Sequence, residues 1–165
     1  MKQEKEIEIR YTYVTDVVYL RQWLTHPGIL NYFPMSPGQE VEDMMQSWIN
    51  FSRWHAGLTA TLNHTPCAMG ILFLMPYQKI AHQALFKMIV DPKRQREGIG
   101  SSLLKNLKHL AKNYFHLKLL NIEIFEDNPM EHLLKNQGFE LIFRQEGFVK
   151  EEGKTKARLF WEAVL

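Results

Sequence analysis

One run, residues 85–104, constrains the fold most, because it joins an apolar strand, a glycine-bearing turn and a helix start. Residues 85–90 are mostly apolar and end in the β-branched pair Ile89-Val90, which predicts a buried strand. Asp91-Pro92 ends that strand, since proline lacks the N–H that a β-ladder needs. Apolar residues then recur at helical spacing, which predicts an amphipathic helix with these inward positions: Ile99, Leu103, Leu104, Leu107, Leu110, Ala111, Tyr114 and Phe115.

The turn between this strand and this helix has the composition of an anion site. Gly98 and Gly100 flank a single apolar residue at the helix start, and three cations precede them: Lys93, Arg94 and Arg96. The first N–H groups of a helix have no partner within it and lie at the positive end of its dipole. Glycine has no Cβ, so a phosphate can approach the backbone closely. A tight turn alone would need only one glycine, so we expect a phosphate-binding turn.

Two common phosphate motifs do not fit this turn. A Walker A loop needs a Gly-Lys-Ser/Thr triplet, which the sequence lacks, and a dinucleotide fingerprint needs a small residue where Leu103 stands. The segment Gln95-Arg96-Glu97-Gly98-Ile99-Gly100 instead resembles the Gln/Arg-x-x-Gly-x-Gly/Ala pyrophosphate loop of the GNAT superfamily of acyl-CoA-dependent N-acetyltransferases. The preceding Val-Asp-Pro and the following Leu-Leu helix make the resemblance more specific.

Composition bounds the remaining possibilities. A chain of 165 residues with 45% hydrophobic residues predicts a single globular domain, residues 1–165. The net charge of +2 gives no general attraction to nucleic acid or to a membrane, and no apolar run has transmembrane length. One cysteine, Cys67, excludes an internal disulfide and suits a reducing compartment. The charged start shows no secretory signal, so we expect a cytoplasmic protein without nucleic-acid or membrane partners.

The order of predicted elements indicates an α+β fold with a mixed, mostly antiparallel central sheet flanked by helices. This order matches the GNAT fold along nearly the whole chain, and the closest resemblance is to the ribosomal-protein alanine acetyltransferases. The predicted segments are a strand at 7–12, helices at 17–24 and 37–49, strands at 58–62, 67–74 and 85–90, a helix at 99–115, a strand at 119–125, a short helix from Asn128 to Gly138, and strands at 139–148 and 157–165 around a charged loop, 150–156.

Local signals predict where the two early helices begin. Thr15-Asp16 is expected to cap the first, with Val18 on its apolar face, and Ser36 is expected to cap the second, with Pro37 as its first residue. Aromatic residues lie between and within these helices. Trp48 is expected in the core, whereas Tyr32 and Phe33 belong either to the core or to the acceptor site that GNAT members form here.

The resemblance assigns residues to a co-substrate, acetyl-CoA. It implies that the strand residues Met88, Ile89 and Val90 hold the pantetheine arm, and that the amide of Met88 or Ile89 stabilises the thioester carbonyl. It implies that the pyrophosphate binds the turn and helix start, at Gln95, Arg96, Glu97, Gly98, Ile99, Gly100 and Ser101. The family's asparagine falls on Asn128 when counted forward from the preceding strand, and on Asp127 when counted back from Gly138-Phe139.

An acceptor ammonium must lose a proton before it attacks, and the leaving thiolate must gain one. The position of the alanine acetyltransferase glutamate falls on His82, whose side chain titrates near neutral pH; the alternative is a loop histidine. Glu123 is a second candidate for the base or for a substrate-binding carboxylate, or else a solvated or ion-paired strand residue. The usual acid, a tyrosine, is missing: its position falls on Leu134 or Lys135, so either water or another residue protonates the thiolate, or catalysis is slow.

These observations predict an N-acetyltransferase that moves the acetyl group of acetyl-CoA to a primary amine by direct attack in a ternary complex. The acceptor stays open between a peptide N-terminus, a lysine, a polyamine and a small amine, and the protein is expected to be a monomer or a homodimer. The missing tyrosine motivates an alternative, a catalytically weak or inactive acyl-CoA-binding module. The histidines show no zinc-binding spacing such as His-Glu-x-x-His, so no metal is expected.

Overall fold

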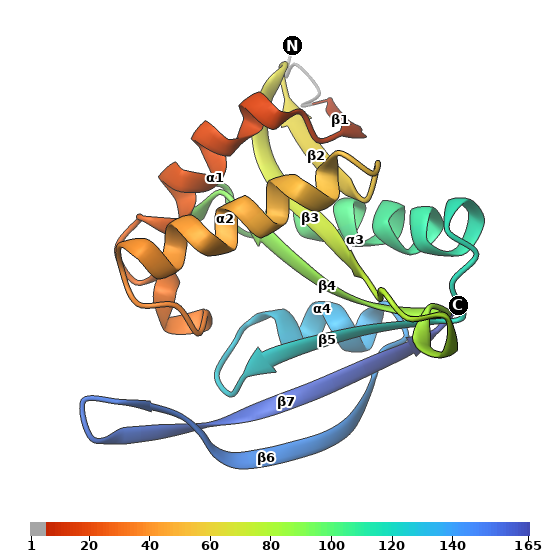
Figure 1. The fold of residues 1–165 in the computed structure, drawn as a ribbon. Helices are drawn as coiled ribbons and strands as arrows, with labels where there is room; N and C mark the ends of the chain where they lie inside the picture. The colour runs from red at the N-terminus through yellow and green to blue at the C-terminus, as the bar shows by residue number, and fades with distance from the viewer. Residues whose placement is uncertain (1–5) are drawn as a thin grey trace.

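The computed structural model describes residues 6–165 as one seven-stranded sheet with helices on both faces (Figure 1). The strand order is β1-β2-β3-β4-β5-β7-β6, and every neighbouring pair is antiparallel except β4 and β5. This confirms the predicted mixed, mostly antiparallel α+β fold. The elements are β1 (Ile7–Tyr11), α1 (Val17–Leu24), α2 (Gln39–Ser52), β2 (Gly57–Leu62), β3 (Thr65–Leu74), β4 (Gln83–Val90), α3 (Ile99–His109), β5 (Leu119–Phe125), α4 (Met130–Asn136), β6 (Glu140–Glu151) and β7 (Lys154–Val164).

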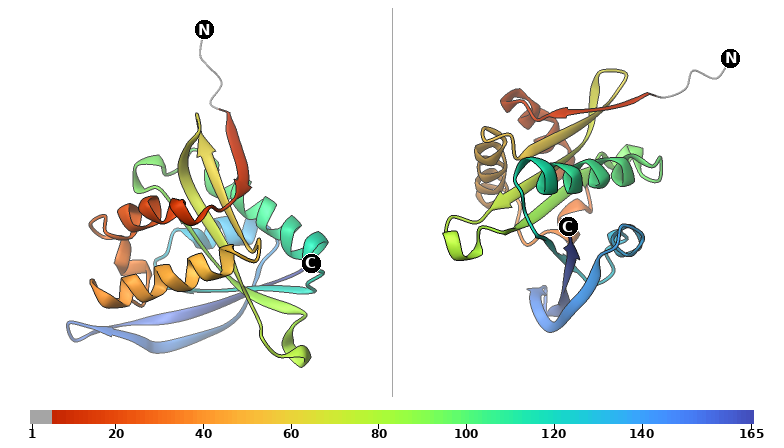
Figure 2. Two further views of the ribbon diagram at one scale, coloured as in Figure 1. Left: turned by 45° about the horizontal axis from the view of Figure 1, so that its top comes forward. Right: turned by 90° about the vertical axis from the view of Figure 1, so that its right-hand side faces the viewer.

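The helices form two layers around the sheet (Figures 1 and 2). Helices α1 and α2 cover one face of the N-terminal strands, while α3 and α4 lie on the other face. We call the face that carries α1 and α2 the front. None of the helices within residues 6–165 covers the front of β5, β7 and β6, so this part of the sheet stays open.

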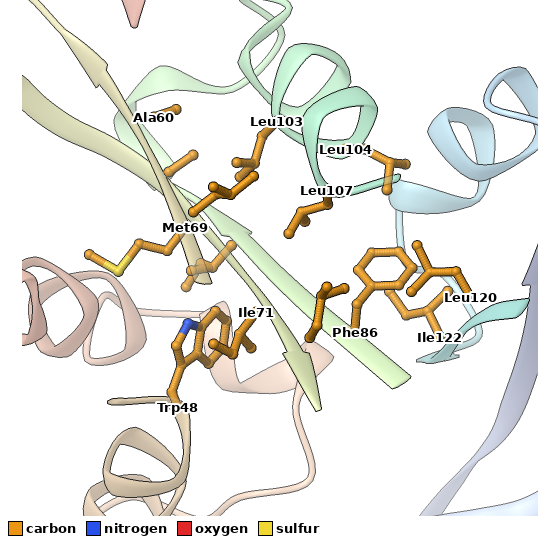
Figure 3. Close-up of a cluster of buried hydrophobic side chains, with 14 of the residues drawn as sticks. Trp48, Ala60, Met69, Ile71, Phe86, Leu103, Leu104, Leu107, Leu120 and Ile122 are labelled. Atoms are coloured by element: carbon orange, nitrogen blue, oxygen red, sulfur yellow. The ribbon is translucent and has the colours of Figure 1, made fainter. Parts of the chain in front are cut away.

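Large apolar side chains fill both layers (Figure 3). Trp48 of α2 is fully buried against the front of the sheet, as its sequence predicts, and Leu103 and Leu107 of α3 are fully buried on the back. At the crossing of α3 and β3 the Leu107 side chain lies directly against Gly70, where an added Cβ would clash with Leu107 Cδ1. Glycine at position 70 therefore sets how closely α3 can approach the sheet.

The pairing of β4 changes along its length, and this change positions the site. On one side β4 pairs with β3 from Ala84 to Val90. On the other side it pairs with β5 only over Gln83–Leu85, opposite Leu119–Asn121, and the two strands then separate. Residues 86–90 of β4 therefore have a free edge in the middle of the sheet.

Two predicted apolar positions prove to be exposed. Val18 of α1 is 61% exposed, because Leu20, Trp23 and Leu24 define the buried side of this short helix and Val18 points away from them. Tyr114 is 52% exposed, because α3 ends at His109 and residues 110–114 continue as one π-helical turn. The wider turn breaks the 3.6-residue period from which its burial was predicted.

The start of α2 also differs from its prediction. The helix begins at Gln39 after Gly38, which has φ of +101° and gives no side-chain cap, so Ser36 and Pro37 precede the helix. The Ser36 amide instead donates to Glu40 Oε2 over 2.5 Å. A glutamate in the first turn thus anchors the incoming chain.

The predicted hairpins form, but with tighter turns. Asn63 and His64 alone, both with positive φ, connect β2 to β3, and Glu152 and Gly153, also with positive φ, connect β6 to β7. The charged loop predicted at 150–156 is therefore wrong, because its residues continue the two strands. Two irregularities in the β6–β7 register bend this long hairpin, one of them next to Gly147.

Candidate active site

The free edge of β4 presents main-chain groups to the gap between the strands. The Asp91 amide donates to Cys67 O of β3, and His82 O accepts from Lys118 at the start of β5. Because successive residues of a strand point their N–H and C=O groups to opposite sides, odd-numbered residues of β4 face β3 and even-numbered residues face β5. The amides of Met88 and Val90 thus point into the gap, whereas the Ile89 amide is used in the ladder with β3. Of the two predicted carbonyl-binding amides, the geometry favours Met88.

The turn after β4 is held by side chains that cap it. Asp91 Oδ1 accepts from the Lys93 amide over 2.9 Å, which starts a single 3-10 turn at Pro92. Gln95 Nε2 donates to Val90 O over 3.1 Å and so ties the turn to the end of the strand. This tether keeps the basic turn next to the free edge.

The helix start has the backbone conformation of an anion site. Gly98 has φ of +79°, a conformation that favours glycine, and a Cβ there would meet nothing within 4 Å. Gly100 lies in the first turn of α3, where a Cβ would touch Met88 Cε and Val90 Cγ2 at 3.5 Å. The first hydrogen bond of the helix is the one from the Ser102 amide to Gly98 O, so the amides of residues 99–101 precede the helical ladder.

Charges around this helix start favour an anion. Lys93 and Arg96 are exposed, and neither forms an ion pair with any of residues 6–165. Arg94 lies 4.0 Å from Glu97, one turn away. The predicted residues 95–101 thus lie together at the end of the free edge.

The open front of the sheet carries a second group of charged residues. Lys87 of β4 points to the front, where its Nζ lies 3.8 Å from Met44 Sδ of α2. Glu123 of β5 faces the same side and accepts from Arg158 of β7 over 2.6 Å. The Arg158 guanidinium lies 4.2 Å from the centre of the Phe148 ring. The sequence reasoning missed Lys87 and Arg158, although a lysine inside an otherwise apolar strand was a signal for the first.

Burial lowers the pKa of the Lys87 ammonium, and the charge of Glu123 opposes this shift. No carboxylate among residues 6–165 lies within 4.0 Å of Lys87 Nζ. Next to it, Met44 lines a pocket of about 430 Å³ at the start of α2, with Pro34, Met35, Glu40, Asp43 and Ser47. Met44 therefore contacts both this pocket and a cation that has no carboxylate within 4.0 Å among residues 6–165.

The structure also places the two predicted bases, His82 and Glu123, and the predicted asparagine, Asn128. His82 is exposed in the turn before β4, at the paired end of the strand, about 20 Å from Met88 along the chain. Asn128 Oδ1 accepts from the amide of Met130, the first residue of α4, over 2.9 Å, and Pro129 is the residue at the N-cap. Glu123, in contrast, lies on the part of β5 that has separated from β4.

Neither residue at the family's tyrosine position carries a hydroxyl group. Leu134 of α4 is fully buried, and Lys135 is exposed with its Nζ 5.9 Å from the centre of the Trp161 ring. Within residues 6–165 we find no cluster of three histidine, cysteine or carboxylate side chains suited to a metal ion. No helix in this part of the chain is long and apolar enough to span a bilayer.

These features fit acetyl-CoA, which has an extended amide-bearing arm and a diphosphate. The free edge of β4 offers main-chain donors and acceptors to the arm, and the start of α3 offers unpaired amides to the diphosphate. The two parts are consecutive in the chain and joined by the Gln95 tether.

Comparisons with known proteins show that solved structures share this fold. The chain is similar in structure to the ribosomal-protein-alanine N-acetyltransferase from Brucella melitensis, with a TM-score of 0.81, 20% identity, and 96% of this chain and 99% of that chain covered. It is similar to yncA from Salmonella typhimurium, solved with its cofactor acetyl-CoA, with a TM-score of 0.82, 15% identity, and 96% and 94% covered. A GNAT-family acetyltransferase from Streptococcus pneumoniae gives a TM-score of 0.78, 20% identity, and 97% and 100% covered.

No curated protein matches the sequence. The profile of the Acetyltransferase (GNAT) family, however, matches residues 17–139, which include α1, the free edge of β4, the glycine turn and α4. The chain therefore belongs to the GNAT family of acetyltransferases.

Proposed function

We propose that this acetyltransferase moves the acetyl group of acetyl-CoA to a primary amine by direct attack in a ternary complex. The observation that carries the proposal is the free edge of β4, which leads through a capped turn into the unpaired amides of α3. The Met88 amide would donate to the thioester carbonyl as negative charge develops on its oxygen. The Met88–Val90 edge would hold the pantetheine arm, and residues 95–101 the diphosphate.

Binding of acetyl-CoA tests the turn. Isothermal titration calorimetry should give a dissociation constant in roughly the micromolar range for the wild type. Gly98→Glu puts a carboxylate where the diphosphate would lie and should abolish binding. Gly153→Glu is the matched control, because Gly153 has φ of +77° against +79° for Gly98, and at both positions an added Cβ would meet no atom within 4 Å. Equal acetyl-CoA affinity of the two variants would show that the diphosphate does not bind at this turn.

Glu123 is the base that the geometry favours, because it lies where the strands have separated, whereas His82 lies at their paired end. Its carboxylate, held by Arg158 at 2.6 Å, would accept the proton of the acceptor ammonium through water. Glu123→Gln should lower kcat while acetyl-CoA affinity persists, and His82→Ala should have the smaller effect. If His82→Ala lowered kcat more than Glu123→Gln, His82 would be the base instead.

The alternative, a catalytically weak or inactive acyl-CoA-binding module, rests on the buried Leu134 and on Lys135, which lies against Trp161. With no tyrosine there, water must protonate the leaving thiolate, whose modest basicity makes this feasible. Release of free thiol with a panel of amines distinguishes the two functions. Tight acetyl-CoA binding without thiol release by any amine would establish the binding module.

A further inference from the structure

We propose that Lys87 selects acceptors whose amine is accompanied by a carboxylate, as in a free amino acid, over acceptors that carry only cations. The inference rests on the proposed acetyl transfer and deepens it by assigning an acceptor class. It starts from the position of Lys87, whose backbone neighbours the Met88 amide but whose side chain points to the front, away from α3.

The two sides of β4 divide the site between two ligands. Met88 and Val90 point their side chains to the back, where they pack against Gly100 at the start of α3. Since the diphosphate turn leads into α3, the co-substrate would reach the edge from that side. An acceptor then approaches from the front, where Lys87 projects two residues beyond the last β4–β5 pair.

Lys87 is the charged group at this position that has no ion pair within 4.0 Å among residues 6–165. Its Nζ contacts a thioether sulfur at 3.8 Å and lies 5.9 Å from the centre of the Phe73 ring, and neither group carries a negative charge. Glu123 is the carboxylate whose charge acts on it, yet Glu123 is already bound to Arg158 at 2.6 Å. A partly buried ammonium in such surroundings is stabilised by any anion that reaches it.

The pocket beside Met44 contains carboxylates that would instead favour a cationic acceptor such as a polyamine. Both of its carboxylates, however, are exposed in the first turns of α2, where the helix dipole stabilises them. Glu40 accepts from the Ser36 amide, and Asp43 from Gln39. These acids have local partners and solvent, whereas Lys87 has neither an anion nor full hydration, so Lys87 is the stronger determinant.

Matched acceptors test the assignment: alanine with ethylamine, leucine with isoamylamine, and phenylalanine with phenethylamine, plus spermidine as a purely cationic acceptor. In any pair of which the wild type acetylates a member, kcat/KM should be at least about tenfold higher for the acceptor that carries the carboxylate. Lys87→Met should abolish this ratio, and Lys87→Arg should keep most of it. Lys105→Met, at an exposed lysine of α3, is the control and should keep all of it.

A binding measurement covers the case of slow turnover. Calorimetry on wild-type protein saturated with CoA should give a lower dissociation constant for N-acetylphenylalanine than for N-acetylphenethylamine. Lys87→Met should remove this difference. The assignment is overturned if the wild type prefers spermidine or the carboxylate-free amines, if Lys87→Met keeps the preference, or if the two acetylated compounds bind alike or not at all. These results leave the proposed transfer standing, whereas failure of the wild type to bind acetyl-CoA would refute the transfer itself.

Discussion

Asp16 connects the first strand, the first helix and the sheet, and replacing it with asparagine should strongly destabilise the protein. The residue is only 3% exposed, and its carboxylate accepts from both terminal nitrogens of Arg10, at 2.7 and 3.0 Å. It also accepts from the Tyr13 amide at 2.9 Å and from Thr59 Oγ1 of β2 at 3.0 Å. An asparagine at this position would keep one acceptor oxygen but would present an amide group to the remaining donors.

The size of the expected loss in stability follows from these contacts. Hydrogen bonds to a charged group contribute about 1.5–3 kcal/mol each, and breaking a buried ion pair typically removes about 3–5 kcal/mol because the partner charge stays buried. Since the four bonds share one carboxylate, they are not additive, and we expect the free energy of unfolding to fall by about 3–5 kcal/mol. That is a large part of the roughly 5–15 kcal/mol typical of a domain.

Urea denaturation followed by circular dichroism measures this change. Glu42→Gln is the matched control, because Glu42 also binds an arginine through two bonds, to Arg21 at 3.2 and 3.0 Å, but on the surface. That variant should unfold at the wild-type midpoint. A midpoint for Asp16→Asn that equals that of Glu42→Gln would refute the view that burial makes this cluster matter.

The pH dependence gives an independent check. Burial alone would raise the pKa of Asp16, but its bonds to Arg10, Tyr13 and Thr59 outweigh burial and lower it. A lowered pKa in the folded state means that the stabilisation is present above the unfolded pKa, near 4, and is lost as the pH falls through the folded value. The stability difference between wild type and Asp16→Asn should therefore be full at pH 7 and shrink below about pH 4.

Three substitutions and one labelling experiment test other contacts. Gly70→Ala should lower the free energy of unfolding by about 1–3 kcal/mol, because its Cβ would clash with Leu107 Cδ1, whereas Gly100→Ala, with contacts at 3.5 Å, should unfold at or above the wild-type midpoint in urea. Burial raises the pKa of the Cys67 thiol to about 11, so Ellman's reagent should label one thiol at pH 8 only after unfolding. Lys87→Met should raise the melting temperature at pH 7, and this gain should fade as the pH rises towards the ordinary lysine range, because the lowered pKa of Lys87 makes the wild type more stable as it deprotonates.

Much of the fold could be predicted from local signals. The strand at 85–90, the turn and the start of α3 follow from apolar runs, proline and glycine, and the structure confirms them, with the strand beginning two residues earlier, at Gln83. The wrong predictions concern positions whose burial depends on how a helix packs against the rest of the protein. Val18 fits an apolar face in isolation, but the side of α1 that is buried depends on how α1 meets the sheet.

The site could be predicted only where it consists of consecutive residues. The turn at 95–101 is a continuous segment, so its composition reveals it. The front of the site assembles Lys87, Glu123 and Arg158 from three strands, and their proximity depends on strand order and register. The separation of β4 from β5 after Leu85 likewise leaves no mark in the sequence of either strand.

The free edge of β4 has a consequence for how such proteins diverge. A ligand gripped by amide and carbonyl groups is indifferent to most side chains, so the segment can drift while the site persists. The solved structures described above share only 15–20% of their residues with this chain over nearly its full length, yet superpose with TM-scores near 0.8. If the edge of β4 binds through its main chain, the side chains on the front, Lys87 among them, can differ between proteins of this fold without loss of that edge.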